Sequence, residues 1–436
     1  MTREYKNILL SIFLALAGYF LAGLSFDETQ SRLVGVVVLL VALWTNEALP
    51  LGVVSLLPIV LFPSLEVLTT GQTTANYSKS IIYLFLGGFL LAIAVEKTGL
   101  HKVIANKLLN IFPSSSRGII FALAVTSAFL SSLLSNTTTA LLLMPIALFL
   151  TDIPRLKIRF VLAIAYGASI GGIITPIGTP PNLILMGFLQ QNNLETLTFI
   201  TWMFKTIPLA AFMLIVVPYI LSLGAGQLEI ENSIESKQMN GEQKKLLKIL
   251  GLLVVVLFVN SFFKFSEAVI LLGFGLAMMI PNFGFLNWDD SRKIPFEIMF
   301  LFGAGFSIAT AFGSTGLAEA ISQMLLTLTE LNPIVMILIV AAMITFTTEV
   351  TSNTALISIA LPIIYSLGMA ADMDTGLILM VATICASYAF MLPIATPPNA
   401  IAMSSRILTI KDMAKYGIFF NLIAIFATTA IAVVYW

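Results

Sequence analysis

The chain has few charged residues, one histidine and one cysteine. Charged residues make up 10% of its 436 residues and hydrophobic ones 58%, whereas a soluble domain carries about 25% charged residues. With His101 and Cys385 alone, no internal disulfide and no cluster of His and Cys metal ligands is possible. The sequence also lacks a Gly-rich phosphate loop and a basic patch for nucleic acid. These absences exclude most soluble enzymes and nucleic-acid partners.

Apolar stretches recur along nearly the whole chain, so its expected surroundings are a lipid bilayer. The pattern predicts an all-α membrane protein with about 11 transmembrane helices and two re-entrant hairpins. The candidate spans are 8–24, 33–48, 51–62, 80–97, 160–190, 206–223, 246–263, 267–281, 296–312, 375–405 and 416–435. The candidate hairpins are the apolar stretches 118–150 and 334–368.

The positive charges orient these spans. With the N-terminus inside and both hairpins dipping in and out on one side, four of the 22 Lys and Arg residues lie outside: Arg32, Lys79, Lys205 and Lys264. This is a strong positive-inside bias. A single span at 118–150 would invert every later loop and weaken the bias. We therefore expect a prokaryotic inner (cytoplasmic) membrane protein with its N-terminus inside and its C-terminus outside.

Short polar and Pro-rich motifs occur twice, always 217 residues apart. Ser-Asn-Thr stands at 135–137 and at 352–354, and Thr-Pro-Pro-Asn at 179–182 and at 396–399. Thr-Gly-Leu at 98–100 recurs at 315–317. Such matches in one register predict a duplication. The charge-based orientation makes it an inverted-topology repeat, as in secondary transporters.

The duplicated motifs place polar groups at membrane depth. Pro180-Pro181 and Pro397-Pro398 must break their helices, which frees backbone carbonyls. Ser and Asn are good N-caps, so each Ser-Asn-Thr triplet is expected to begin a half-helix at a hairpin tip. Neutral oxygens there suit a small cation, while N–H and O–H donors suit an anion. Because neither motif contains Lys, Arg or His, an anion would need co-bound cations, which favours coupled transport.

The paired motifs resemble those of the divalent anion:sodium symporter family, including bacterial INDY-type dicarboxylate transporters, over almost the whole chain. The resemblance implies an elevator mechanism, a homodimer and at least two Na⁺ sites. Its implied sodium ligands are Ser131, Ser135, Asn136 and the Gly178 carbonyl in one site, and Thr348, Ser352, Asn353 and the Ala395 carbonyl in the other. Its implied substrate-binding residues are Asn136, Thr137, Thr179, Pro180, Asn353, Thr354, Thr396 and Pro397.

The resulting organisation starts with a first span and external loop at 1–32. A first repeat at 33–223 contains scaffold helices 33–112, a hairpin 117–151, a broken helix 160–190 and a span 206–223. After a cytoplasmic linker at 224–245, a second repeat at 246–436 contains scaffold helices 246–330, a hairpin 333–368, a broken helix 375–405 and a span 416–435.

Two ionisable residues lie outside this scheme. Glu349 precedes the second triplet, and an intramembrane carboxylate is a candidate functional residue. It is expected to support structure, carry a proton or act indirectly on sodium. His101 begins the segment after Thr98-Gly99-Leu100, which is expected to be an amphipathic interfacial helix. We expect His101 to be a surface residue facing the inner headgroups.

Together these features predict sodium-coupled symport of a C4-dicarboxylate such as succinate, malate or fumarate into the cell. The same fold could instead carry sulfate, citrate or 2-oxoglutarate, or work as a sodium-independent exchanger. A channel is disfavoured because no ring of charged residues is present. An enzyme is disfavoured because Glu349 has no acidic or histidine partner in the motifs.

Overall fold

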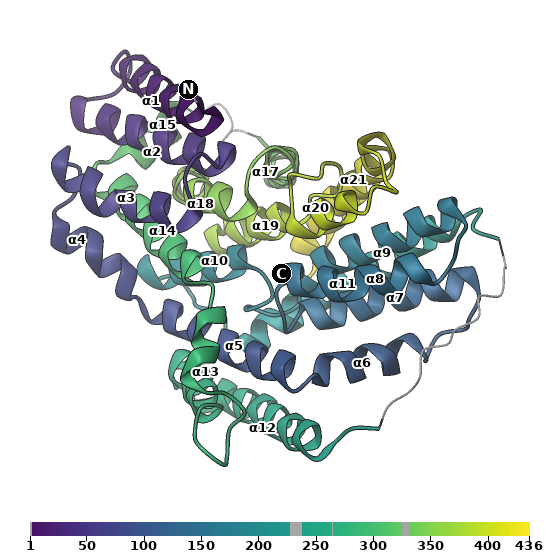
Figure 1. The fold of residues 1–436 in the computed structure, drawn as a ribbon. Helices are drawn as coiled ribbons and strands as arrows, with labels where there is room; N and C mark the ends of the chain where they lie inside the picture. The colour runs from purple at the N-terminus through teal and green to yellow at the C-terminus, as the bar shows by residue number, and fades with distance from the viewer. Residues whose placement is uncertain (1, 227–237, 264, 325–330) are drawn as a thin grey trace.

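The computed structural model describes residues 2–226, 238–263, 265–324 and 331–436, and these residues form helices with no strand (Figure 1). Lys264 and parts of the predicted linker 224–245 and segment 246–330 lie outside the described residues. The helices of the first half are α1 (Arg3–Ala22), α2 (Glu28–Asn46), α3 (Leu51–Ser64), α4 (Thr70–Ala75), η1 (Asn76–Ser78), α5 (Ser80–Lys97), α6 (Leu100–Leu109), α7 (Ser116–Ser131), α8 (Asn136–Phe149), α9 (Pro154–Gly172), α10 (Pro180–Gln191) and α11 (Phe199–Ser222). Those of the second half are α12 (Gly241–Phe263), α13 (Glu267–Ala277), η2 (Trp288–Lys293), α14 (Phe296–Ser314), α15 (Leu317–Met324), α17 (Pro333–Thr348), α18 (Asn353–Ala370), α19 (Thr375–Ser387), α20 (Pro397–Ser404) and α21 (Ile410–Val434).

The helices of the first predicted hairpin are short, whereas the second contains α18, which is one of the helices long and apolar enough to cross a membrane. Seven of the described helical segments are long and apolar enough to cross a membrane. The helices α7 and α8 have 16 and 14 residues, which at about 1.5 Å per residue is less than the roughly 30 Å of a hydrocarbon core. They are joined by a short turn, as are α17 and α18. This helix–turn–helix form is what the predicted hairpins at 118–150 and 334–368 require.

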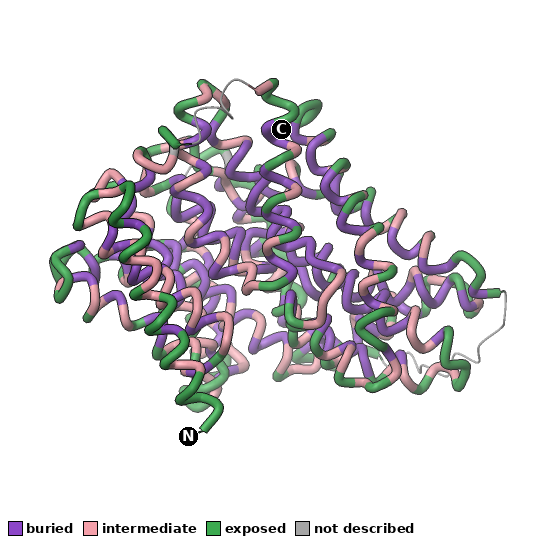
Figure 2. The backbone as a smooth tube through the Cα atoms, turned by 90° about the horizontal axis from the view of Figure 1, so that it is seen from above, coloured by how far each residue is buried: buried purple, intermediate pink, exposed green. Residues whose placement is uncertain are grey.

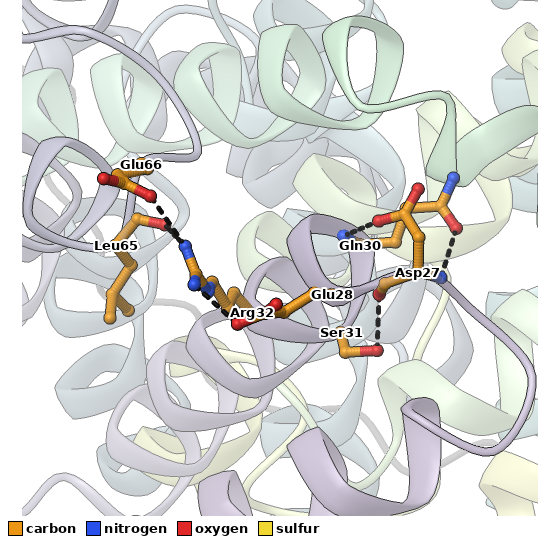
Figure 3. A network of polar contacts seen from close by, with 7 residues as sticks. All are labelled: Asp27, Glu28, Gln30, Ser31, Arg32, Leu65 and Glu66. Carbon is orange, nitrogen blue, oxygen red and sulfur yellow. Dashed lines mark hydrogen bonds and ion pairs between the residues drawn. The ribbon is translucent and has the colours of Figure 1, made fainter.

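The start of α2 is fixed by a polar network (Figure 3). Asp27 and Gln30 form a capping box, which satisfies free N–H groups of the first turn. Arg32 pairs with Glu28 at 2.6 Å and with Glu66 at 3.0 Å. These contacts begin the helix at Glu28, five residues before the predicted span at 33. The predicted external loop is therefore short, because polar capping extends the helix beyond its apolar part.

Each half donates one glutamine hydrogen bond to the same kind of helix turn in the other half. Gly99 and Gly316 both have left-handed backbone, with φ of 69° and 70°, and each ends a turn between two helices. Gln243 of α12 donates to Thr98 O at 3.0 Å, and Gln30 of α2 donates to Thr315 O at 3.0 Å. The helix pairs α5–α13 and α14–α3 also pack across the halves. The first helices of each half therefore hold the other half in place.

Buried residues gather in the interior of the molecule, and the chain near the N-terminus is largely exposed (Figure 2). Nearly every residue of 160–173 and 376–390 is buried or half-buried, whereas α1 is largely exposed. His101 contradicts its prediction as a surface residue, since it is 4% exposed and its Nδ1 lies 3.0 Å from Val95 O. The amphipathic α6 turns this side chain inward, where the last turn of α5 supplies a polar partner.

Close packing between α7 and α9 depends on glycine. A Cβ added to Gly171 would lie 2.1 Å from Ala128 O, and one added to Gly167 would lie 2.5 Å from Ala124 O. The hairpin can approach the broken helix this closely only without side chains at those points. Real Cβ contacts are longer, so a substitution must push the two backbones apart.

We predict that Gly171→Ala lowers stability by about 1–3 kcal/mol, the usual cost of overpacking. The measurement is the Tm of the purified protein in detergent. Gly251→Ala is the matched control, because nothing lies within 4 Å of the added Cβ and alanine favours a helix. Equal Tm values for Gly171→Ala and the control would contradict this packing argument.

Candidate functional site

One cavity of about 1240 Å³ joins both Ser-Asn-Thr triplets and both helix breaks. Its wall includes residues predicted for the site from the two halves: Ser135, Asn136, Thr137, Gly178, Thr179 and Pro180, and Ser352, Asn353, Thr354, Ala395, Thr396 and Pro397. The structure therefore brings together segments that are 217 residues apart in the sequence. The cavity extends to Arg3 and Glu4 of α1, which places its mouth near the N-terminus.

Four helices begin at this cavity. The first residues of α8 and α18 are Asn136 and Asn353, and those of α10 and α20 are Pro180 and Pro397. All four residues line the cavity. The N-terminus of a helix carries about half a positive charge, so four of them amount to about two charges. The site can therefore attract an anion although no Lys, Arg or His lies among the motif residues.

The first hairpin tip is held by hydroxyl groups. Ser135 is the N-cap of α8, and its Oγ accepts a hydrogen bond from Thr138 N at 3.0 Å. Ser131 is fully buried and donates to Asn136 Oδ1 at 2.5 Å. A Cβ added to Gly172 would lie 3.1 Å from Asn136 Oδ1, so the end of α9 packs directly on this amide. Asn136 is thus fixed between the hairpin and the broken helix.

The second tip uses the same residue types with other partners. Ser352 is the N-cap residue of α18 by position, but its side chain makes no capping bond. Thr354 donates to Asn353 Oδ1 at 3.0 Å. Thr348 is fully buried and donates to Ala386 O at 3.0 Å, which ties the hairpin to α19. Ser131 and Thr348 therefore lie behind the cavity wall and not on it.

Two asparagines close the helix breaks in the same way. Asn182 Nδ2 donates to Gly172 O and Thr175 O, both at 2.9 Å. Asn399 Nδ2 donates to Ala389 O at 2.9 Å and to Leu392 O at 3.1 Å. The asparagine and both carbonyls of the second break lie 217 residues after their counterparts in the first. Each amide therefore binds carbonyls at the end of the interrupted helix, where the residue four positions after Gly172 is Pro176 and that after Ala389 is Pro393, neither of which has an N–H group to donate.

Glu349 fixes the second break from the hairpin side. Its Oε1 accepts from Met391 N at 2.9 Å and from Asn421 Nδ2 at 2.6 Å, and its Oε2 accepts from Leu392 N at 2.8 Å. Asn421 Oδ1 in turn accepts from Phe390 N at 3.1 Å. This carboxylate binds backbone N–H groups that no helix satisfies. It does not line the cavity.

Asn182, Asn399 and Asn421 are site residues that the sequence reasoning missed. The signal for Asn182 and Asn399 was present, because both belong to the duplicated Thr-Pro-Pro-Asn motif. Asn421 carries no such signal, since its counterpart at the same offset is Phe204. Its role depends on a contact with Glu349 across 72 residues, which only folding reveals.

We predict that Asn399→Asp impairs the protein, because a carboxylate oxygen would face two carbonyl oxygens in a buried place. Losing these bonds should cost about 1–3 kcal/mol or more. The check is a lower Tm together with slower substrate uptake by the reconstituted protein. Asn193→Asp, at an exposed turn position with φ of 52°, is the control. If Asn399→Asp had the same Tm and uptake rate as the control, Asn399 would not stabilise the helix break.

Paired hairpins, interrupted helices and one shared cavity define the chain as a secondary transporter embedded in a membrane. Residues 39–385 match the model of a family described as citrate transporters. The chain is 31% identical to the sodium-dependent dicarboxylate transporter SdcS of Staphylococcus saprophyticus, over 90% of this chain and 84% of that protein. It is 32% identical to SdcS of Staphylococcus aureus, over 92% and 86%. The family match and the relatives together show that the chain belongs to the divalent anion:sodium symporter family, as its motifs suggested.

Two solved structures share the fold at low sequence identity. The MtrF protein of Neisseria gonorrhoeae, from a class of antimetabolite efflux pumps, gives a TM-score of 0.63 at 13% identity over 84% of this chain and 83% of MtrF. The YdaH transporter of Alcanivorax borkumensis gives 0.59 at 14% identity over 93% and 98%. Both likenesses confirm an all-helical transporter fold.

Proposed function

We propose that this protein carries C4-dicarboxylates such as succinate, malate and fumarate into the cell together with sodium. The observation that supports this most is the convergence of four helix N-termini on one cavity. Their combined charge of about two matches a dianion. The relatives named as sodium-dependent dicarboxylate transporters support the same substrate and ion.

The substrate carboxylates are proposed to contact the amides and hydroxyls at the tips and breaks. The groups concerned belong to Asn136, Thr137 and Thr179 in the first half and to Asn353, Thr354 and Thr396 in the second, with Pro180 and Pro397 beside them. All of them line the cavity. Hydrogen-bond donors on opposite walls suit a molecule with a carboxylate at each end. An elongated dianion could therefore bridge the two halves.

At least two sodium ions are proposed to bind between each tip and the neighbouring break. The first site uses Ser131, Ser135, Asn136 and the Gly178 carbonyl, and the second uses Thr348, Ser352, Asn353 and the Ala395 carbonyl. Neutral oxygens of this kind replace the hydration shell of a small cation. Asn136 and Asn353 belong to both the ion and the substrate sites, so binding of one favours the other. This shared amide is a physical basis for coupling.

The cavity is proposed to face the cytoplasm. Its mouth lies near Arg3 and Glu4, and the positive-inside bias puts the N-terminus on the cytoplasmic side of a prokaryotic inner membrane. The C-terminus would then be outside. Alternating access by elevator movement of the hairpins and broken helices within an inverted-repeat homodimer completes the proposal.

We predict that sodium alone drives uptake of radiolabelled succinate into proteoliposomes, when inward sodium, potassium and proton gradients are imposed in parallel. Malate and fumarate should compete, and sulfate should not. Competition by citrate is tested in the same assay because the matching family is described as citrate transporters. Equal uptake under all gradients, with dependence on internal substrate, would contradict symport and indicate an exchanger.

We predict that Asn136→Ala and Asn353→Ala each abolish coupled uptake and leave the protein folded. Each removes an amide that lines the cavity. Cys385→Ser is the control, since this buried thiol lies outside the cavity wall and its loss should keep most of the activity. Sodium-driven uptake at the wild-type rate in either asparagine variant would overturn the site assignment.

A further inference from the structure

Glu349 is a buried carboxylate without a basic partner. It is 3% exposed, and it accepts hydrogen bonds from two backbone N–H groups and the Asn421 amide. None of the ion pairs found among the described residues includes it. A buried charge with neutral partners only is costly, and a nearby cation would offset the cost.

The hydrogen bonds of Glu349 fit an ionised carboxylate, because the side chain accepts all three of its hydrogen bonds with the described residues. Both oxygens accept N–H bonds, Oε1 from Met391 and Asn421 and Oε2 from Leu392. An ionised carboxylate accepts on both oxygens, whereas an acid uses one oxygen to donate. In this ionised form Glu349 places a negative charge inside the transporter.

This charge stands between the two chain segments that supply the proposed second sodium site. Thr348 is its neighbour in the chain. Leu392, whose N–H it accepts, has a carbonyl that accepts a hydrogen bond from Ala395 N at 3.3 Å. Hairpin tip and broken helix are thus joined through the carboxylate. A cation bound between them would also lie beside its charge.

The first sodium site has no equivalent charge. The residue at the matching position is Ser132, whose Oγ donates to Phe129 O at 2.8 Å. Its backbone carbonyl accepts from Thr175 Oγ1 at 2.5 Å. Trp202 and Thr206 donate to carbonyls of the first break. In the first half neutral donors thus bind backbone carbonyls at the break, whereas in the second half Glu349 accepts from backbone N–H groups.

We propose that the two sodium sites are unequal, and that the charge of Glu349 makes the second site bind sodium more tightly, so that it fills first. This inference rests on the proposed sodium symport. It adds an order of binding that the repeated motifs by themselves do not contain. The carboxylate positions the backbone of the second break and attracts the bound sodium ion electrostatically, without touching the substrate.

The test is sodium binding to the purified full chain in detergent, without dicarboxylate. Sodium replaces choline at constant ionic strength, and the rise in Tm gives the half-saturating concentration. Glu349→Gln keeps the shape and removes the charge, so half-saturation should rise roughly tenfold, the effect of about 1.4 kcal/mol of lost attraction. Glu349→Asp keeps the charge and shortens the side chain, and should lie closer to wild type.

A purely structural role would lower the Tm of both variants in choline and leave half-saturation no higher in Glu349→Gln than in Glu349→Asp, because Gln turns a donor NH2 toward an N–H group and Asp is too short to reach both N–H groups. Half-saturation that is unchanged in Glu349→Gln, or raised more in Glu349→Asp, overturns the proposal. No sodium-dependent rise in Tm of the wild type would instead contradict the sodium symport on which the proposal rests.

A second comparison leaves Glu349 intact and decides the question if its variants do not fold. Asn136→Ala removes the first site, so sodium should still bind the second site, and half-saturation should stay near the wild-type concentration. Asn353→Ala removes the second site and should leave the weak one, with half-saturation roughly tenfold higher. Equal half-saturation in these two variants overturns the inequality of the sites.

Discussion

Backbone that leaves the helix inside a membrane must find its hydrogen-bond partners within the protein, and the site is organised around this constraint. Pro180-Pro181 and Pro397-Pro398 break two buried helices, and Asn182 and Asn399 each bind two of the freed carbonyls. The hairpin tips pack against the same breaks. Because these contacts hold irregular backbone in fixed positions, helix ends can face a shared cavity at little further cost.

The two halves meet the constraint with different chemistry. In the first half, hydroxyl and indole donors such as Thr175 and Trp202 bind buried backbone carbonyls. In the second half, Glu349 binds N–H groups of the break and receives help from Asn421. The second half has the buried Glu349 at the position where the first half has Ser132.

Several elements were predictable because local chemistry decides them. Ser135 and Ser352 stand at the N-cap positions of α8 and α18, as N-cap preference predicts, and Ser135 also makes the capping hydrogen bond. The Pro-Pro pairs fall at the starts of α10 and α20, since proline is accepted at the first turn of a helix. His101 was placed wrongly at the surface, because the periodicity of a short amphipathic helix does not say which face meets another helix.

The sequence by itself determined the membrane setting, the hairpins, the breaks and the duplicated motifs, since each depends on composition or on neighbours in the chain. Tertiary structure alone decided that both triplets share one cavity, that Ser131 and Thr348 lie behind its wall, and that Glu349 meets Asn421. These pairings join residues far apart in the chain. Their energies depend on packing between helices, and no local pattern encodes which helix faces which.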